Sequence, residues 1–209
     1  MARALTLALP SNTLEAAIRA HFGLAQAELA RYLGVSASLV AKVEAGRRRP
    51  SRPVEQRLTR LGDLLPPPTG QGPVAPRFAA APLPPPPVVE LPDFGAALPL
   101  APLRWRQAQV LAQASRLRWQ LHQAGKGAAL QQRREWGLAQ LQAALGPAAL
   151  PDPAEQAHVG RWLAVLAADV QAAAPTPAAR AAQALAVLRL LTLDAEAAAL
   201  APLVAAAGG

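Results

Sequence analysis

Three consecutive arginines, Arg47, Arg48 and Arg49, form a dense cluster of positive charge in this sequence. Guanidinium groups bind phosphate oxygens, so the cluster suits a polyanionic partner, although a solvated surface loop is the alternative. The three histidines lack the spacing of metal ligands, and the chain contains no cysteine. There is also no glycine-rich phosphate loop, no paired carboxylates and no Ser/His/Asp set. We therefore expect no enzymatic activity, no cofactor, no metal and no small-molecule ligand.

Two short helices within residues 26–45 are expected to position these arginines, because apolar residues recur there at helical spacing. Gly34 lies between the two helices, where the backbone must reverse and only glycine takes a positive φ at little cost. Ser36 is the predicted N-cap of the second helix, accepting an N–H two or three residues later. Ala30 is small, which allows the second helix to cross close to the first. This pattern predicts a helix-turn-helix.

Further helices are expected on either side of this pair. Asn12 and Glu15 have the spacing of a capping box, which predicts a helix that begins at Asn12. Pro53 suits the first turn of a helix that follows the arginines. Residues 13–65 are thus predicted to form four short helices around one small core, preceded by an N-terminal arm over residues 1–12.

Residues 14–61 contain a characteristic set of residues around the predicted turn. They are Gly23, Leu24, Gln26, Ala27, Glu28, Leu29, Ala30, Leu33, Gly34, Val35, Ser36, Val40, Val43, Glu44 and Gly46. With them, the segment resembles the Cro/C1-type (XRE) helix-turn-helix family of phage and bacterial repressors. The resemblance implies a lambda-repressor-like domain whose recognition helix, over residues 36–45, enters the major groove of double-stranded DNA. It also implies a buried ion pair of Arg19 with Glu44, between the first helix and the recognition helix.

The candidate DNA-contacting residues lie on and around the predicted recognition helix. They are Gln26, Ser36, Ala37, Ser38, Leu39, Lys42, Arg47, Arg48 and Arg49. The resemblance implies that Gln26 bonds a phosphate, and the arginines are expected to do the same. Leu39 is expected to be exposed near the groove, where it could touch a thymine methyl group. Arg19, Ala30, Gly34 and Glu44 are the candidate structural residues of the site.

The predicted base-facing positions carry mostly small side chains. Of Ala37, Ser38, Ala41 and Lys42, only the serine and the lysine can hydrogen-bond a base. Ala25 stands where the family usually has a capping side chain, which should cost about 1 kcal/mol of local stability. The sequence therefore predicts a DNA-binding transcriptional regulator with poor direct readout. The alternative is a non-enzymatic scaffold or adaptor, or an antitoxin-like protein, whose helix-turn-helix serves protein interaction.

Residues 66–102 change composition abruptly. Thirteen of the 22 prolines fall in this stretch, and it contains only three charged residues. Such a segment cannot sustain helical or sheet hydrogen bonding and favours polyproline II or disorder. We expect it to be a Pro-rich linker.

Helical patterns return over residues 103–209. Gly125 and Gly127 are expected to break the first helix there, and later breaks are expected at Gly146 and Pro175. The four resulting helices are predicted to form two hairpins packed as a bundle, which serves self-association or binds a partner.

Two tryptophans of this region, Trp105 and Trp119, lie two heptads apart beside the main apolar stripe. Packing at the edge of the core is the preferred interpretation, with a subunit interface second and a nucleic-acid surface third. Tyr32, in the helix-turn-helix, is expected to pack at the surface.

The net charge of the chain is +8, and residues 1–65 hold ten basic against five acidic residues. A basic small domain suits a polyanion, although charge alone does not identify one. The short apolar run before Pro10 lacks the features of a signal peptide. No apolar stretch of transmembrane length is expected, so the sequence predicts a cytoplasmic protein without a membrane partner.

Overall fold

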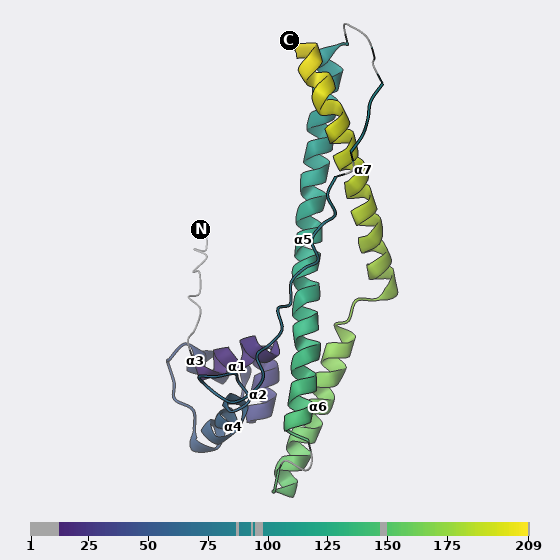
Figure 1. Ribbon diagram of the computed structural model, residues 1–209. Coiled ribbons are helices and arrows are strands. Elements are labelled where there is room, and N and C mark those ends of the chain that lie inside the picture. The colour runs from purple at the N-terminus through teal and green to yellow at the C-terminus, as the bar shows by residue number, and fades with distance from the viewer. Residues whose placement is uncertain (1–12, 87, 93, 95–97, 147–149, 209) are drawn as a thin grey trace. The chain divides into compact units, whose positions relative to one another are not determined.

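The computed structural model describes residues 13–86, 88–92, 94, 98–146 and 150–208. The described residues form seven helices and no strand, which confirms the predicted mainly α fold (Figure 1). The predicted arm over residues 1–12 lies outside this part of the chain. The helices are α1 (Leu14–Phe22), α2 (Gln26–Leu33), α3 (Ala37–Glu44), α4 (Arg52–Gly62), α5 (Leu100–Ala144), α6 (Pro153–Ala172) and α7 (Pro177–Gly208).

Helix α1 begins one residue later than the capping-box spacing predicts. Thr13 is its N-cap, and the Thr13 hydroxyl accepts the backbone N–H of Ala16 at 3.4 Å. The prediction of a cap at Asn12 is therefore wrong, although Asn12 itself lies outside the described residues. The physical reason is that a threonine hydroxyl, like an asparagine side-chain oxygen, can accept a hydrogen bond from the first N–H groups of a helix, which have no partner within the helix.

The turn between α2 and α3 has the predicted geometry. Gly34 ends α2 with a φ of 70°, in the left-handed region, and the Ser36 hydroxyl caps α3 by accepting the N–H of Leu39 at 3.3 Å. Ala25 offers no side-chain cap to α2, as expected. The Glu28 carboxylate supplies one missing contact, because it accepts the Ala25 N–H at 2.6 Å.

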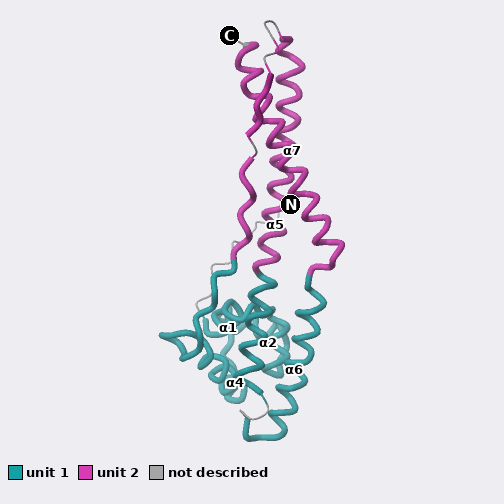
Figure 2. The backbone as a smooth tube through the Cα atoms, turned by 45° about the vertical axis from the view of Figure 1, so that its right-hand side comes forward, with its two compact units in different colours: residues 1–78, 130–174 teal, residues 79–129, 175–209 magenta. Residues whose placement is uncertain are grey.

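The chain divides into two compact units in a way the sequence did not predict (Figure 2). Unit 1 comprises residues 1–78 and 130–174, and unit 2 comprises residues 79–129 and 175–209. This division differs from the predicted one into residues 13–65, 66–102 and 103–209. Its cause is that the four N-terminal helices share a core with the end of α5 and with α6.

The core of unit 1 shows why these segments fold together. Tyr32 on α2 is fully buried, and its ring lies 4.7 Å from that of Trp162 on α6. Phe22 on α1 stacks on Trp136 of α5, with ring centroids 6.5 Å apart. The expectation that Tyr32 packs at the surface is wrong, because α6 covers the face of α2 that carries it.

Helix α5 runs without a break through Gly125 and Gly127, contrary to the prediction of two separate helices there. Consequently the described residues after 99 form three helices rather than four. A Cβ at Gly125 would lie 2.5 Å from the Cβ of Ala80, so this glycine admits the Pro-rich segment against α5. Glycine can thus mark a close approach of chains as well as a helix end.

Gly137 has the same role within unit 1. A Cβ at this position would lie 2.2 Å from the backbone carbonyl oxygen of Phe22, at the end of α1. The absence of a side chain lets α5 lie directly against the helix-turn-helix region.

The segment that follows α4 turns back onto it rather than leaving as a free linker. The N–H of Gln71 donates to the carbonyl of Asp63 at 2.9 Å, and that of Gly72 to the carbonyl of Leu65 at 2.8 Å. Further on, the ring of Phe78 packs against Trp136 at 6.2 Å. Backbone hydrogen bonds and an aromatic contact thus hold residues up to 78 in unit 1, beyond the predicted start of the linker at residue 66.

Unit 2 contains the first two-thirds of α5 packed against α7. Two ion pairs join the helices: Arg106 Nε lies 2.5 Å from Glu196, and Arg118 Nη2 lies 2.5 Å from Asp194, which is buried. The fully or nearly buried apolar residues between them are Val110, Ala114, Leu121, Leu190 and Leu193.

Helix α7 is long and apolar enough, by length and composition alone, to cross a membrane. The most apolar 18-residue window within its stretch Pro177–Ala207 has a mean hydropathy of 1.6, and 22% of that window is buried. The expectation that no stretch reaches transmembrane length is therefore wrong, because a run of alanines raises hydropathy without adding large side chains. A core helix of a soluble protein has the same properties.

Candidate nucleic-acid interface

The outer face of α3 carries the residues predicted to face bases. Ala37, Ser38 and Lys42 are exposed, and Ala41 is half-buried. The Ser38 hydroxyl lies 3.1 Å from that of Ser36, which is already engaged as the α3 cap. Lys42 is therefore the longest flexible donor on this face, with Ser38 as a short second donor.

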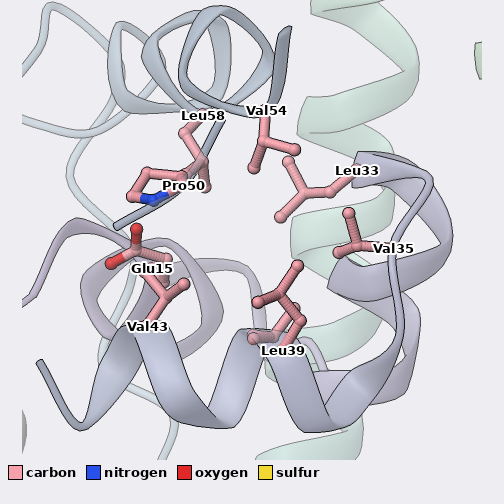
Figure 3. Close-up of a pocket in the computed structure, with 9 residues that line it drawn as sticks. Glu15, Leu33, Val35, Leu39, Val43, Pro50, Val54 and Leu58 are labelled. Carbon is pink, nitrogen blue, oxygen red and sulfur yellow. The ribbon is translucent and has the colours of Figure 1, made fainter. Parts of the chain in front are cut away.

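Leu39 is half-buried rather than exposed, which corrects the sequence-based expectation. Its side chain points into an apolar pocket between α3, the end of α2 and α4 (Figure 3). Pro50 and Val54 lie across this pocket, with Glu15 at its edge. Leu39 is drawn inward because the start of α4 offers it an apolar surface, so it helps to hold α3 in place.

Glu44, at the end of α3, gathers donors from two other helices. Its carboxylate receives Arg19 Nε of α1 at 2.5 Å and Arg19 Nη2 at 3.1 Å. The Gln26 side-chain amide of α2 donates to the same carboxylate at 2.6 Å. The Glu44 side chain is 8% exposed and that of Arg19 is 26% exposed. The Arg19–Glu44 pair implied by the resemblance is thus present, and it fixes the orientation of α3 against α1 and α2.

Gln26 lies at the first position of α2, beside the end of α3. An amide nitrogen carries two N–H groups, so one can bond Glu44 while the second remains for another acceptor. The structure brings Gln26 to the same network as Arg19, a relationship that the sequence did not predict.

The basic loop follows α3 directly. Gly46 has a φ of 68°, and the backbone N–H of Arg47 donates to the carbonyl of Lys42 at 2.8 Å, which closes the helix. Arg47, Arg48 and Arg49 are all exposed, and none forms an ion pair with a described residue. Three solvated guanidinium groups therefore stand at the exit of α3.

The C-terminal part of unit 1 supports α2 from its far side. Arg134 of α5 lies 2.6 Å from the Glu28 carboxylate, and the indole N–H of Trp162 donates to the Glu28 carbonyl at 2.9 Å. Because Glu28 also accepts the Ala25 N–H, α5 and α6 stabilise the start of α2. In the sequence, Trp162 lies among apolar residues at helical spacing, Val159, Leu166 and Val170, but no local signal identifies the helix that it covers.

A second contact lies at the end of α2, where Arg57 of α4 donates to the carbonyls of Tyr32 and Leu33 at 3.3 and 3.2 Å. Arg57 also binds Glu155 of α6, and Arg60 Nη1 lies 3.1 Å from the same carboxylate. The hydrogen bond from Arg57 lowers the pKa of Glu155 below its usual value. Burial raises the pKa of Tyr32 and outweighs the opposing charge of Arg60.

The described residues offer no group of three or more His, Asp or Glu side chains that could hold a metal ion. The features of the site are instead a short helix with small exposed side chains, an adjoining run of arginines and a rigid support. A helix-turn-helix family profile matches residues 16–60. This segment is a Cro/C1-type helix-turn-helix.

The Cro/C1-type segment coincides with α1 to α4. The family is a DNA-binding one, so the chain carries a helix-turn-helix of the DNA-binding kind. No curated protein and no solved structure matches the chain.

Proposed function

We propose that this protein is a cytoplasmic DNA-binding transcriptional regulator, with α3 in the major groove and the helices of unit 2 serving self-association. The observation that carries the proposal is the exposed face of α3 followed directly by three arginines, none of which forms an ion pair within the described part of the chain. Such an arrangement lets the arginines bind phosphates while the helix lies against the bases.

Phosphate contacts supply most of the affinity in this proposal. Arg47, Arg48 and Arg49 reach the backbone beyond the end of α3, and Gln26 reaches it from the start of α2 with its second amide N–H. Glu44 holds Gln26 in position, so the ion pair with Arg19 also organises the phosphate contact.

Base contacts are few, so specificity is modest. Lys42 can donate a hydrogen bond to guanine, whereas the Ser38 hydroxyl can hydrogen-bond with more than one kind of base. Ala37 and Ala41 add only apolar contact. Because Leu39 is turned into the pocket, it does not contact a thymine methyl group.

Self-association compensates for weak readout, because two tethered domains bind with higher avidity than one. Unit 2 supports this role because its helices expose large apolar side chains, among them Trp105 and Trp119. The proposed cytoplasmic location is supported by Asp194, a charged residue in α7 that is buried and paired with Arg118. A charge near the middle of a spanning helix would be costly.

The decisive experiment is the selection of genomic DNA fragments by the full-length protein across a salt series. We expect enriched fragments with a short shared motif, and retention that falls steeply as salt rises. Binding without a shared motif would mean that the protein is a non-specific DNA-binding protein. If no fragment is retained at low salt, the scaffold or adaptor function, favoured by the small residues on α3, replaces this proposal.

A further inference from the structure

Two tryptophans of α5 project from the outer side of unit 2. Trp105 and Trp119 are each 65% exposed, although indoles are among the largest apolar side chains. At 100° per residue, both lie on the side of the helix opposite Val110 and Ala114, which face α7. The core of unit 2 therefore does not account for them, and the preferred interpretation as edge-of-core packing is wrong.

The residues between the tryptophans are small. Ala108, Ala112 and Ser115 are exposed and share the same helix face, at the alternating spacing of three and four. Ala112 stands seven residues from each tryptophan, or about 10 Å along the helix axis. The face is thus symmetric, with a small centre and a large side chain at each end.

We propose that this face binds the same face of a second copy of the chain, with the two α5 helices crossing at Ala112. The inference rests on the self-association contained in the proposed function, and it specifies the surface. Two crossing helices are closest at the crossing point and diverge on either side of it. Small residues at the centre permit the close approach, and Trp105 and Trp119 fill the widening space at the two ends.

The symmetry of the face favours a second copy over an unrelated partner. In a two-fold dimer the same patch must complement itself. A patch whose large residues flank a small centre at equal distances meets this requirement. Trp is also the residue type most enriched among the side chains that dominate interface energies.

The charges beside the tryptophans are compatible with this contact. At 100° per residue, Arg106 and Arg118 lie toward α7 rather than on this face, and each is paired with a carboxylate of α7 in its own chain. Their charges are therefore directed away from the proposed contact, and Arg104 and Arg116 are the arginines that border the face. Arg104 and Arg116 remain available to stack on the indoles of the partner.

The buried area suits a reversible dimer. Covering the exposed part of four indoles removes roughly 400–650 Å² from water. The small central residues and Leu111, which is exposed beside the face, add to this. The indoles alone supply roughly half of the about 1,000 Å² that a specific interface buries, and the smaller side chains must supply the rest, so association is expected at micromolar concentrations.

Sedimentation velocity of the full-length protein tests the surface. We expect the parent to be dimeric, and Trp105→Ala/Trp119→Ala to be monomeric with unchanged helicity, because both side chains are exposed. The matched control is Leu185→Ala/Leu188→Ala, which removes two side chains that are 66% and 59% exposed on α7. This control should remain dimeric. A dimeric tryptophan variant, or a monomeric leucine variant, would overturn the proposal.

Cross-linking tests the crossing point, since the chain has no cysteine of its own. Ala112→Cys should form a disulfide-linked dimer on mild oxidation, whereas exposed Ala184→Cys on α7 should not. A dimer that cross-links at residue 184 and not at 112 refutes the crossing at Ala112. The DNA-binding part of the proposed function is unaffected by that result.

A membrane is the other partner that an apolar face could meet. The test is flotation of the parent with vesicles of phosphatidylethanolamine and phosphatidylglycerol. We expect no binding by the dimer. A monomeric parent that floats with the vesicles would overturn both the second-copy interface and the self-association role, while DNA binding, measured separately, could still hold.

Discussion

Trp162 of α6 donates its indole N–H to the backbone carbonyl oxygen of Glu28, 134 residues earlier in the chain and within the Cro/C1-type segment. The same indole packs on the buried ring of Tyr32. The DNA-binding fold of this protein therefore includes a tryptophan from its C-terminal half. The stability of the helix-turn-helix and the orientation of α2 within it therefore depend on helices that lie outside the segment matched by the family profile.

Replacing Trp162 should destabilise unit 1. Trp162→Ala removes a buried aromatic side chain and leaves a cavity against Tyr32, which should cost about 3–5 kcal/mol in free energy of unfolding. Chemical denaturation followed by circular dichroism measures the change. Trp105→Ala, at an exposed position, is the matched control and should change the unfolding of unit 1 little. Equal effects of the two variants would contradict the packing of α6 on α2.

Removing Glu44 should weaken the orientation of α3. Glu44→Ala leaves Arg19 without its partner and Gln26 without its acceptor. Loss of one partner from a largely buried pair costs about 3–5 kcal/mol, and the partial exposure of Arg19 places the expected loss near the lower end. The double variant Arg19→Leu/Glu44→Leu should melt closer to the parent, because no charge is left unpaired. Thermal melts within a degree or two for Glu44→Ala and the parent would show that the pair is solvated.

The basic loop should control the salt dependence of DNA binding. Changing Arg47, Arg48 and Arg49 to alanine should reduce the slope of log affinity against log salt by up to about 2.7, or about 0.9 for each lost phosphate contact. Fluorescence anisotropy with a labelled duplex measures the slope. The matched control, Arg77→Ala/Arg161→Ala/Arg180→Ala, removes the same charge at exposed sites elsewhere. Similar slopes for the two triple variants would show that the loop arginines affect DNA binding only through the net charge of the protein.

Lys42 should carry most of the direct readout. If it donates to guanine, Lys42→Ala should cost about 1–3 kcal/mol at a preferred site and relax the preference at one base pair. Competition between the selected site and single-base variants measures this. An equal loss on random DNA would make Lys42 a phosphate contact only.

Stability should fall in two ranges as the solution is acidified. His21 is buried between Phe22 and Trp136, and burial, with the charge of Arg133, lowers its pKa below the usual 6.5. The unfolded state therefore binds a proton first, so stability is lost as pH falls below about 6.5. Denaturant unfolding at several pH values should show this loss, and His21→Gln should remove it.

Glu155 acts in a lower range. Because hydrogen bonds from Arg57 and Arg60 lower its pKa below the usual 4.5, its contribution is complete above that value and is lost as the carboxylate protonates below it. Glu155→Gln should lose the contribution at neutral pH and flatten the profile in that range. A parent profile that is flat below pH 4.5 would contradict the contact.

Local features of the site were predictable from the sequence. The turn at Gly34 and the cap at Ser36 depend on residues that lie within a few positions of one another. The Arg19–Glu44 pair followed from the resemblance, and the segment match agrees with it in extent. Such features are fixed by backbone geometry and hydrogen bonding over short distances, which residue types reveal directly.

The residues whose surroundings were predicted wrongly have one cause in common. Leu39 was expected outside and lies against α4, Tyr32 was expected at the surface and lies under α6, and Gly125 was expected to end a helix that continues. In each case the deciding neighbour comes from another part of the chain. An amino-acid type states what a side chain can do, but not which distant surface will cover it.

The sequence by itself thus determined the type of the protein: a helical chain with a Cro/C1-type helix-turn-helix and a run of arginines at its exit. Only the tertiary structure decided that residues 130–174 belong to the same compact unit as that segment. Trp162 and Arg134 lie more than a hundred residues from Glu28, and their contacts follow from the burial of large apolar faces. Burial is non-directional and has no sequence spacing of its own, so the pairing of those faces appears only when the chain has folded.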